Sequence, residues 1–277
     1  MIRENFVVLD MNTCRSEAAV QPLLDEYDRA ATGIYIPAIA NWELTKGTDD
    51  TLPASLRLLA QRPEAVSVAF HTYVVKGHEK KYKRRVDIVD NRHTRNIRDV
   101  LRGLRDDTRE IDPATVAVVR EHWRKLLDRE DDANVLRQLE QIHRRELAQS
   151  RANLIRDALQ ADPPDRRPFR TYLVEALGDR EDLARFLVGV DYGHVTARKL
   201  AAFPSISLLY LIALHAMALR WRVFGGVAGA RDDRLQNDMV DAEYAVLAAY
   251  GRDLVTRDAG ARAMYEDLIS VAGTLWG

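Results

Sequence analysis

The sequence has a single cysteine, Cys14. No disulfide can therefore form within the chain, and no Cys/His pattern with zinc-ligand spacing occurs, which fits a reducing compartment. The net charge is only −1 over 277 residues, so the composition as a whole favours neither a nucleic acid nor a membrane surface as a partner. Any site for a polyanion must come from local clustering of basic residues.

Long apolar runs are lacking as well. The most apolar segment, ISLLYLIALHAMAL at 206–219, contains His215 and is shorter than the roughly 20 residues that a membrane-spanning helix needs. The first residues, MIRENFVVLD, hold an apolar run too short for a signal peptide. We therefore expect a buried helix at 206–219, no membrane attachment and a cytoplasmic location.

The residues that are present describe a folded protein with an α/β beginning. Apolar residues make up 47% of the chain and charged residues 30%. NFVVLD (5–10) is typical of a buried parallel strand, and the apolar spacing after it predicts a helix over 16–30 capped by Ser16. IYI (34–36) predicts a second strand, and Pro37 can start a helix that stops at Gly47. The order strand, helix, strand, helix indicates an α/β domain.

The middle of the chain reads differently. Residues 53–202 show mostly amphipathic helical patterns with heavy charge, although VSVAF (66–70) fits either a strand or the beginning of a helix. An apolar helix (205–222), a helix (238–250), a strand (253–256) and a helix (260–270) then restore the α/β pattern. We therefore expect one discontinuous α/β domain, 1–52 with 203–277, interrupted by a helical insertion at 53–202.

Four carboxylates stand at or near the predicted strand ends. Asp10 ends the first strand, Glu43 lies in the helix after the second, Asp241 opens the helix at 238–250, and Asp258 follows the last strand. Ligands of open parallel sheets bind at the carboxyl ends of the strands. Carboxylates that meet there repel one another unless a divalent cation neutralises them, and hard oxygen ligands suit Mg²⁺ or Mn²⁺. This pattern indicates metal-assisted phosphodiester hydrolysis.

Each of these acidic residues also has a purely structural interpretation. Asp238 and Asp241 could cap the helix at 238–250, and Asp258 could cap the helix at 260. Asp10 could be a turn residue and Glu43 an exposed helical residue. The combination of all four at these positions favours the functional interpretation, while Asp238 stays ambiguous between a cap and a neighbour of Asp241 on one helical face.

Three segments together resemble the signature blocks of PIN domains: VVLDMNT, IPAIANWELTKG and DAEYAVLAAYGRDLVTRD. The resemblance covers 5–47 and roughly 205–270, and its last block is the most specific. It implies a short parallel sheet flanked by helices and a nuclease that depends on Mg²⁺ or Mn²⁺, usually acting on RNA. The long insertion at 53–202 has no counterpart in small members of the family, so the choice of substrate stays open.

The resemblance assigns roles to particular residues. Asp10, Glu43, Asp241 and Asp258 match the acidic quartet that binds metal, and Thr256 matches a hydroxyl residue near it. Asn12 and Asp238 lie close to the matched positions and are expected to support the metal shell.

Alternatives to an active nuclease follow from the same residues. The chain could be a PIN-like scaffold that binds RNA or a protein partner without cutting, or a nuclease restrained by an inhibitor, as in toxin–antitoxin or phage-defence systems. DMNT (10–13) also resembles the phosphatase motif DxDxT, but Asn12 replaces the second aspartate, which should be the general acid. Single-stranded DNA as the substrate and an oligomeric state stay open.

A basic stretch at 76–105 is the local exception to the near-neutral charge. It holds eleven basic residues against four acidic ones, and phosphate backbones favour such a patch. Tyr73 and Tyr82 could stack on unpaired bases. The stretch could equally be a solvated helix face. Beside a nuclease-like site we expect it to grip the substrate backbone, through Lys80, Lys81, Lys83, Arg84, Arg85, Arg92 and Arg95.

Overall fold

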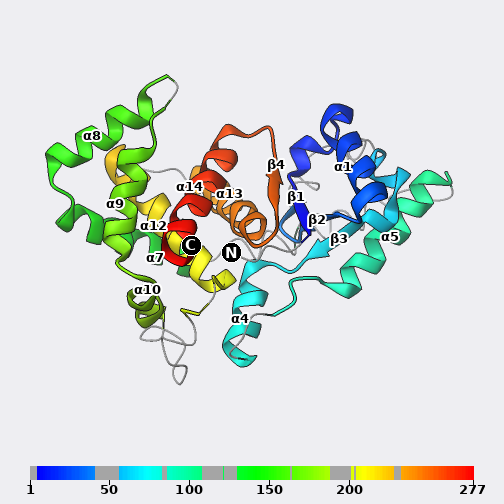
Figure 1. Cartoon of the computed structure of the whole chain (residues 1–277), viewed down its shortest axis with the longest axis horizontal. Helices are drawn as coiled ribbons and strands as arrows, with labels where there is room; N and C mark the ends of the chain where they lie inside the picture. Colours follow the sequence, from blue (N-terminus) through cyan, green and yellow to red (C-terminus); the bar gives the residue numbers. More distant parts are fainter. Residues whose placement is uncertain are drawn as a thin grey trace.

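Four short strands form one parallel sheet in the computed structural model, with the order β3-β2-β1-β4 (Figure 1). The strands are β1 (Phe6–Leu9), β2 (Gly33–Pro37), β3 (Val66–Ala69) and β4 (Asp253–Val255). The structure describes residues 5–40, 56–82, 86–107, 121, 130–162, 164–187, 201–202, 204–227 and 232–277. The α/β class expected from the sequence is confirmed.

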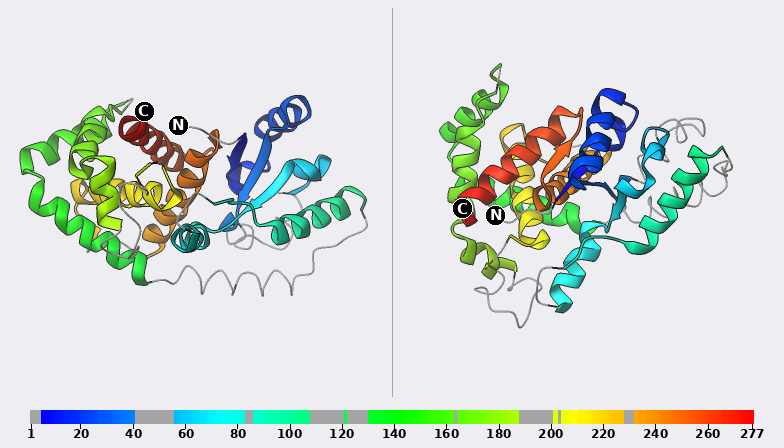
Figure 2. Two further views of the ribbon diagram at one scale, coloured as in Figure 1. Left: turned by 60° about the horizontal axis from the view of Figure 1, so that its bottom comes forward. Right: turned by 45° about the vertical axis from the view of Figure 1, so that its right-hand side comes forward.

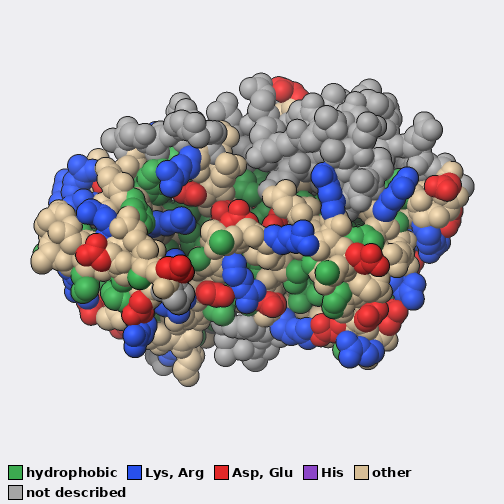
Figure 3. All heavy atoms as spheres, turned by 90° about the horizontal axis from the view of Figure 1, so that it is seen from above, with side chains coloured by type: hydrophobic (Ala, Val, Ile, Leu, Met, Phe, Trp, Pro, Cys, Tyr) green, Lys and Arg blue, Asp and Glu red, His purple; other side chains and the backbone are tan. Residues whose placement is uncertain are grey.

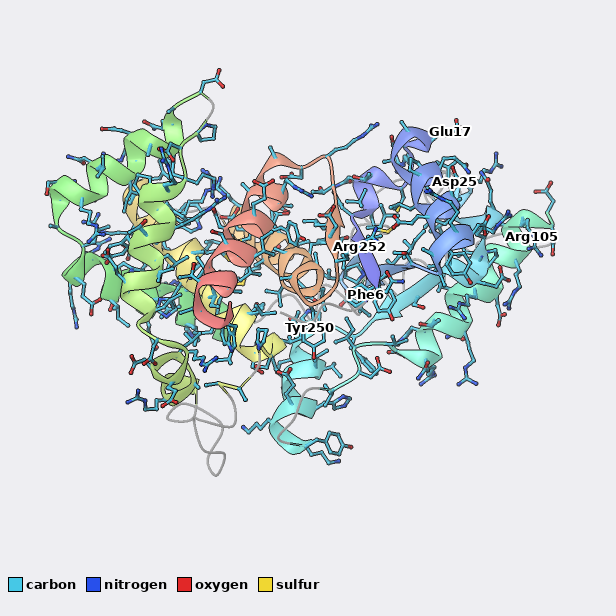
Figure 4. All side chains as sticks on the ribbon, in the orientation of Figure 1. Phe6, Glu17, Asp25, Arg105, Tyr250 and Arg252 are labelled. Atoms are coloured by element: carbon cyan, nitrogen blue, oxygen red, sulfur yellow. The ribbon has the colours of Figure 1, made fainter. Side chains whose placement is uncertain are left out.

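The central strand, β1, joins the two ends of the chain. Its residues are all buried, and Val8 pairs with Tyr35 of β2 on one side and with Leu254 of β4 on the other. Phe6, Tyr250 and Arg252 mark the amino ends of β1 and β4, on the side away from Glu17 at the beginning of α1 (Figure 4). The carboxyl ends of both strands therefore meet at the upper edge of the sheet in this view.

Helices flank the sheet and extend well beyond it. Around the sheet lie α1 (Glu17–Ala30), α4 (Thr72–Tyr82), α5 (Asn91–Arg105), α12 (Ile206–Val223), α13 (Asp232–Tyr250) and α14 (Ala259–Trp276). At one end of the molecule gather α7 (Glu130–Glu146), α8 (Gln149–Gln160), α9 (Arg167–Leu177) and α10 (Arg180–Leu187) (Figure 1). Short 3-10 turns are η1 (Met11–Thr13), η2 (Leu59–Gln61) and η3 (Pro63–Ala65).

The apolar helix α12 lies at the centre of the packed helices. It packs against α7, α13, α14 and α4, and all of its residues except Arg220 and Arg222 are buried. By length and composition it could cross a membrane, yet 89% of it is buried inside the fold. This agrees with the core helix expected at 206–219.

Near the amino terminus, the helix expected over 16–30 is confirmed as α1, whereas its cap and the role of Pro37 differ from the expectation. The helix α1 ends because Ala31 adopts a left-handed conformation (φ 52°), and Ser16 stands at its N-cap position without a capping side-chain hydrogen bond. Pro37, expected to start a helix, is the last residue of β2, where it pairs with Ala69. The rest of that predicted helix, at 41–47, lies outside the described residues.

The segment VSVAF, ambiguous in the sequence, supplies the edge strand β3, which pairs with β2 over four residues. The sheet therefore draws on a segment within the range 53–202, and α5 packs directly against that strand. Before β3, the described residues include a helical residue at Leu56 and the short 3-10 turn η2.

The helix before β4 is longer than expected. It begins at Asp232 rather than near 238, because the sequence DDRLQN contains no glycine or proline that would stop a helix. Asp238 and Asp241 therefore lie inside α13. The capping interpretation of both residues is wrong, and so is the expectation that Asp241 opens the helix.

Buried carboxylates hold α4 in place at both ends. Glu79, 1% exposed, accepts hydrogen bonds from the first turn of α12: from Ile206 N at 3.0 Å, and from Ser207 N at 3.0 Å and Oγ at 2.7 Å. Glu243 of α13 accepts from Thr72 N at 3.1 Å and pairs with His71 at 3.0 Å. Charged groups at a helix N-terminus satisfy its open N–H groups, so these contacts fix α4 firmly on α12 and α13.

A third buried carboxylate joins the helical end to the sheet region. Asp267 of α14 is 1% exposed and accepts hydrogen bonds from Arg166 at 2.9 Å and from Arg170 at 2.7 Å. Arg170 belongs to α9 and Arg166 directly precedes that helix. A buried carboxylate needs such partners, because an unpaired charge in the interior costs several kcal/mol.

Candidate metal centre

Asp10 lies where β1 ends, and its carboxylate is held on both oxygens. Its backbone N–H donates to Val255 O at 3.0 Å, which continues the ladder between β1 and β4. The side chain is 4% exposed. Oδ1 accepts a hydrogen bond from Asn12 N at 3.1 Å and Oδ2 accepts one from the Thr256 hydroxyl at 2.7 Å. Asn12 thus acts through its backbone, while its side chain is exposed.

Asp258 follows β4 and caps α14. Its Oδ1 accepts hydrogen bonds from Gly260 N at 2.6 Å and Ala261 N at 3.0 Å, as expected of an aspartate at this position. Its own N–H donates to Thr256 Oγ1 at 2.9 Å. The capping role left open by the sequence is therefore present. It occupies one carboxylate oxygen and places this aspartate one hydroxyl away from Asp10.

Asp241 projects from α13 toward the same turn. A Cβ placed on Gly260 would lie 3.0 Å from Asp258 Oδ1 and 3.5 Å from Asp241 Oδ2. The two oxygens can therefore be no farther apart than the sum of these distances. Asp241 and Asp258, 17 positions apart in the chain, therefore lie near each other at this turn.

The electrostatics show mutual repulsion in this group. Burial raises the pKa of Asp10 above its usual value and the charge of Asp258 raises it further, while the hydrogen bonds from Thr256 and Asn12 act in the opposite direction. Burial also raises the pKa of Asp238, and Asp258 again adds to the effect, against the lowering influence of Arg220 and Trp221. The negative charge of Asp258 thus reaches carboxylates on two different elements.

Of the four acidic residues expected to bind metal, the structure describes three. Asp10, Asp241 and Asp258 gather at the carboxyl edge of the sheet with Thr256 and Asp238, whereas Glu43 lies outside the described residues. Within the residues that the structure describes, no three His, Cys, Asp or Glu side chains are grouped closely enough to hold a metal ion by themselves. The ligand chemistry suits a hard cation, and the described protein ligands alone do not complete a coordination shell.

The basic stretch does not lie beside the acidic group. Lys80 and Lys81 are exposed at the end of α4, and Arg92 and Arg95 are exposed on the first turns of α5. Lys83, Arg84 and Arg85 lie outside the described residues. Figures 1 and 2 place α4 on the opposite side of the molecule from the turn between β4 and α14. The described part of the basic stretch is therefore not adjacent to the acidic edge, and its expected grip on the substrate backbone stays a prediction.

Two arginines missed by the sequence reasoning do approach this edge. Arg220 and Arg234 both lower the pKa of Asp238, and the guanidinium of Arg234 lies 4.9 Å from the ring centre of Trp221. A signal for Arg220 was present: it and Arg222 are the only charged residues with described positions in α12. Seen from above, acidic side chains gather near the middle of this face with basic side chains around them (Figure 3).

Compared with protein-family models, with curated proteins and with solved structures, the chain has no significant match.

Proposed function

We propose that this protein is a metal-dependent nuclease of the PIN type, acting on RNA. The observation that carries the proposal is the convergence of Asp10 and Asp258, from the ends of two neighbouring parallel strands, on the single hydroxyl of Thr256. Asp241 reaches the same turn from α13. Carboxylates whose pKa is raised by burial and by one another are typical of functional sites.

The acidic group suits Mg²⁺ or Mn²⁺ even without a third described ligand in close contact. Mg²⁺ keeps several waters and is usually held by one or two carboxylates together with phosphate oxygens of the substrate. Asp10, Asp241 and Asp258 would hold the cation, and Glu43 would bind it or position the attacking water. When bound, the cation supplies charge neutralisation at the phosphate and a water of lowered pKa.

The described residues have definite tasks in this scheme. Thr256 and the backbone of Asn12 keep the Asp10 carboxylate oriented and favour its ionised form. Asp258 is fixed by the first N–H groups of α14, so its carboxylate needs little reorganisation when a ligand arrives. Arg220 and Arg234 supply positive charge beside Asp238, where an anionic substrate would otherwise meet carboxylates alone.

The test combines cation binding with cleavage. Calorimetry should detect Mn²⁺ binding to the parent protein, and the same protein should cut a labelled single-stranded RNA when Mn²⁺ is present. Asp10→Asn and Asp258→Asn should each weaken cation binding and abolish cutting. Asp157→Asn, an exposed aspartate on α8, is the matched control and should behave as the parent. Asp10→Asn and Asp258→Asn proteins that fold and cut normally would refute the site.

A PIN-like scaffold without catalysis is the second proposal. It is favoured by one observation: the described carboxylates do not by themselves form a metal-binding group. A scaffold would bind RNA in the presence of a chelator and show no heat of Mn²⁺ binding. Mn²⁺ binding together with Mn²⁺-dependent cutting would exclude it.

A further inference from the structure

The outward face of α4 combines aromatic and basic side chains. Tyr73, Gly77, Lys80 and Lys81 follow one another at helical spacing, while Thr72, Val75 and Glu79 form the buried face. Tyr73 is 56% exposed and Tyr82 52% exposed, although large aromatic rings are usually buried. Both tyrosines therefore present ring surface to the solvent on the same helix as the exposed Lys80 and Lys81.

The ring of Tyr82 is packed beside His78 and Lys81. Its centre lies 6.1 Å from the ring of His78, which meets Phe70 edge-on at 5.6 Å. The ammonium of Lys81 lies 5.2 Å from the Tyr82 ring centre. An exposed ring that is held by neighbouring rings and accompanied by a cation is a platform on which an unpaired base can stack while its phosphate meets the ammonium.

The helix surface beside Tyr73 is open. Gly77 lies on the exposed face, one turn after Tyr73 and one turn before Lys81, and a Cβ added to it would meet nothing within 4 Å. The surface at Gly77 is therefore open between the ring of Tyr73 and the ammonium of Lys81 along the helix.

The charge of this face is more positive than the sequence indicates. Glu79 is the only acidic residue of α4, and it is buried against the first turn of α12 instead of facing the lysines. Arg92 and Arg95 add exposed positive charge on α5, which begins on the same side of the molecule (Figures 1 and 2). With its carboxylate turned inward, α4 offers an anionic partner attraction without an acidic neighbour on the helix itself.

We propose that the α4 face, defined by Tyr73, Gly77, Lys80 and Lys81 and continued around the helix beyond Lys81 by Tyr82, is a docking surface for single-stranded RNA that is separate from the acidic edge. Exposed rings interleaved with cations fit unpaired bases and phosphates better than a duplex, whose bases are already stacked. Because α4 lies on the opposite side of the molecule from the turn between β4 and α14, one RNA must be long to use both surfaces. Binding of RNA by α4 does not depend on the proposed nuclease function. Only its expected effect on cleavage rests on that function.

The first experiment measures binding without any cleavage. Fluorescence anisotropy in a chelator would use a single-stranded oligouridine of about 40 nucleotides and one of about 6, near the lower end of single-strand site sizes. Lys80→Glu/Lys81→Glu should weaken binding of the long RNA about tenfold and reduce its salt dependence, since each lost phosphate contact lowers the slope by roughly 0.7. The matched control is Arg137→Glu/Arg145→Glu on α7, which changes the net charge equally and should leave binding near that of the parent.

Gly77 offers a second probe that does not endanger the fold. Gly77→Glu places a carboxylate in open space on the α4 face and should weaken binding of the long RNA several-fold, whereas Gly77→Ala should not. The proposal is overturned if Lys80→Glu/Lys81→Glu binds as the parent does, or if the α7 control loses as much affinity. Binding to phosphatidylserine vesicles, with no measurable binding of the long RNA, would also overturn it.

Cleavage then separates this proposal from the nuclease assignment. With Mn²⁺, Lys80→Glu/Lys81→Glu should slow cutting of the long RNA and leave cutting of the short RNA unchanged. RNA binding through α4 without any cutting would refute the nuclease and keep the docking surface. Cutting that depends on Asp10 but is equally fast in Lys80→Glu/Lys81→Glu for both RNAs would refute the docking surface and keep the nuclease.

Discussion

The hydroxyl of Thr256 donates to Oδ2 of Asp10 at 2.7 Å, although 246 positions separate the two residues. The same hydroxyl oxygen accepts from the N–H of Asp258 at 2.9 Å. One side chain thus ties together the ends of β1 and β4 and orients the carboxylate that the proposed function needs most.

Replacing that hydroxyl should change the pH range in which the site can bind a cation. The Thr256 hydrogen bond lowers the pKa of Asp10, so Thr256→Val should raise this pKa still further above its usual value. Because a protonated carboxyl does not bind Mn²⁺, the affinity for Mn²⁺ should be lost at a higher pH than in the parent. Thr256→Ser keeps the hydroxyl and should restore the parental profile. Identical pH profiles for the Val variant and the parent would argue against the orienting role.

The charge of Asp258 can be tested without any metal. Asp258→Asn removes the negative charge and keeps a side chain that caps helices well, so α14 should stay intact. Because Asp258 raises the pKa of both Asp10 and Asp238, both values should move down toward the usual one in this variant. Carboxyl carbon shifts followed by NMR titration would measure this. An unchanged pKa of Asp10 would mean that the two carboxylates are not neighbours in solution.

A buried histidine pair should make the fold sensitive to acid. His143 Nε2 of α7 lies 3.4 Å from His215 Nδ1 of α12. Burial lowers the pKa of His143 to about 4, and burial together with His143 lowers that of His215 to about 3. Both values lie below the ordinary 6.5, so the unfolded chain takes up protons before the native one does. The stability contributed by the neutral pair is complete above pH 6.5 and is lost as pH falls toward the folded values.

At pH 5 this effect should cost roughly 2 kcal/mol for each histidine relative to pH 7. Urea denaturation at the two pH values would measure it. His143→Gln should reduce the loss, since glutamine does not titrate, while His93→Gln on the exposed beginning of α5 serves as the control. An equal loss of stability in the parent and in His143→Gln would contradict the prediction.

Removing the Glu79 carboxylate should lower the stability of the fold, because this side chain is buried and does not contribute to the surface charge. Glu79→Ala leaves the N–H groups of Ile206 and Ser207 without their acceptor in a buried place, which should lower the free energy of unfolding by about 3 kcal/mol. Glu146→Ala, at an exposed position on α7, should change it by less than about 0.5 kcal/mol. Denaturant titration compares the two. Equal small effects would mean that α12 does not depend on this cap.

Much of the fold was predictable because its signals are local. The strand at NFVVLD, the helix at 206–219 and the last strand–helix unit each carry their apolar pattern within a few residues. β3 was ambiguous because five apolar-rich residues fit both periods equally well. The beginning of α13 was not predicted, because the segment from Asp232 to Asp238 carries no distinct signal for a helix start. It only lacks a glycine or proline that would stop the helix.

The candidate site was predictable at its strand ends and not in its surroundings. Asp10 follows an apolar strand directly and Asp258 lies three residues after one, and parallel pairing of those strands brings them to the same edge. The position of the basic stretch depends on where α4 emerges from β3, which spacing in the sequence does not encode. The sequence did not indicate that Glu79 is buried. The N–H groups that bind its carboxylate belong to residues more than 120 positions later in the chain.

The pairing of β1 with β4 also determines when the acidic edge can exist. During translation, a ribosome must complete residues 253–258 before β1 finds its second neighbour and before Asp10 receives the hydroxyl of Thr256. Contacts between segments so distant in sequence form late in folding. A nascent chain that already displays α4 therefore still lacks the assembled carboxylates.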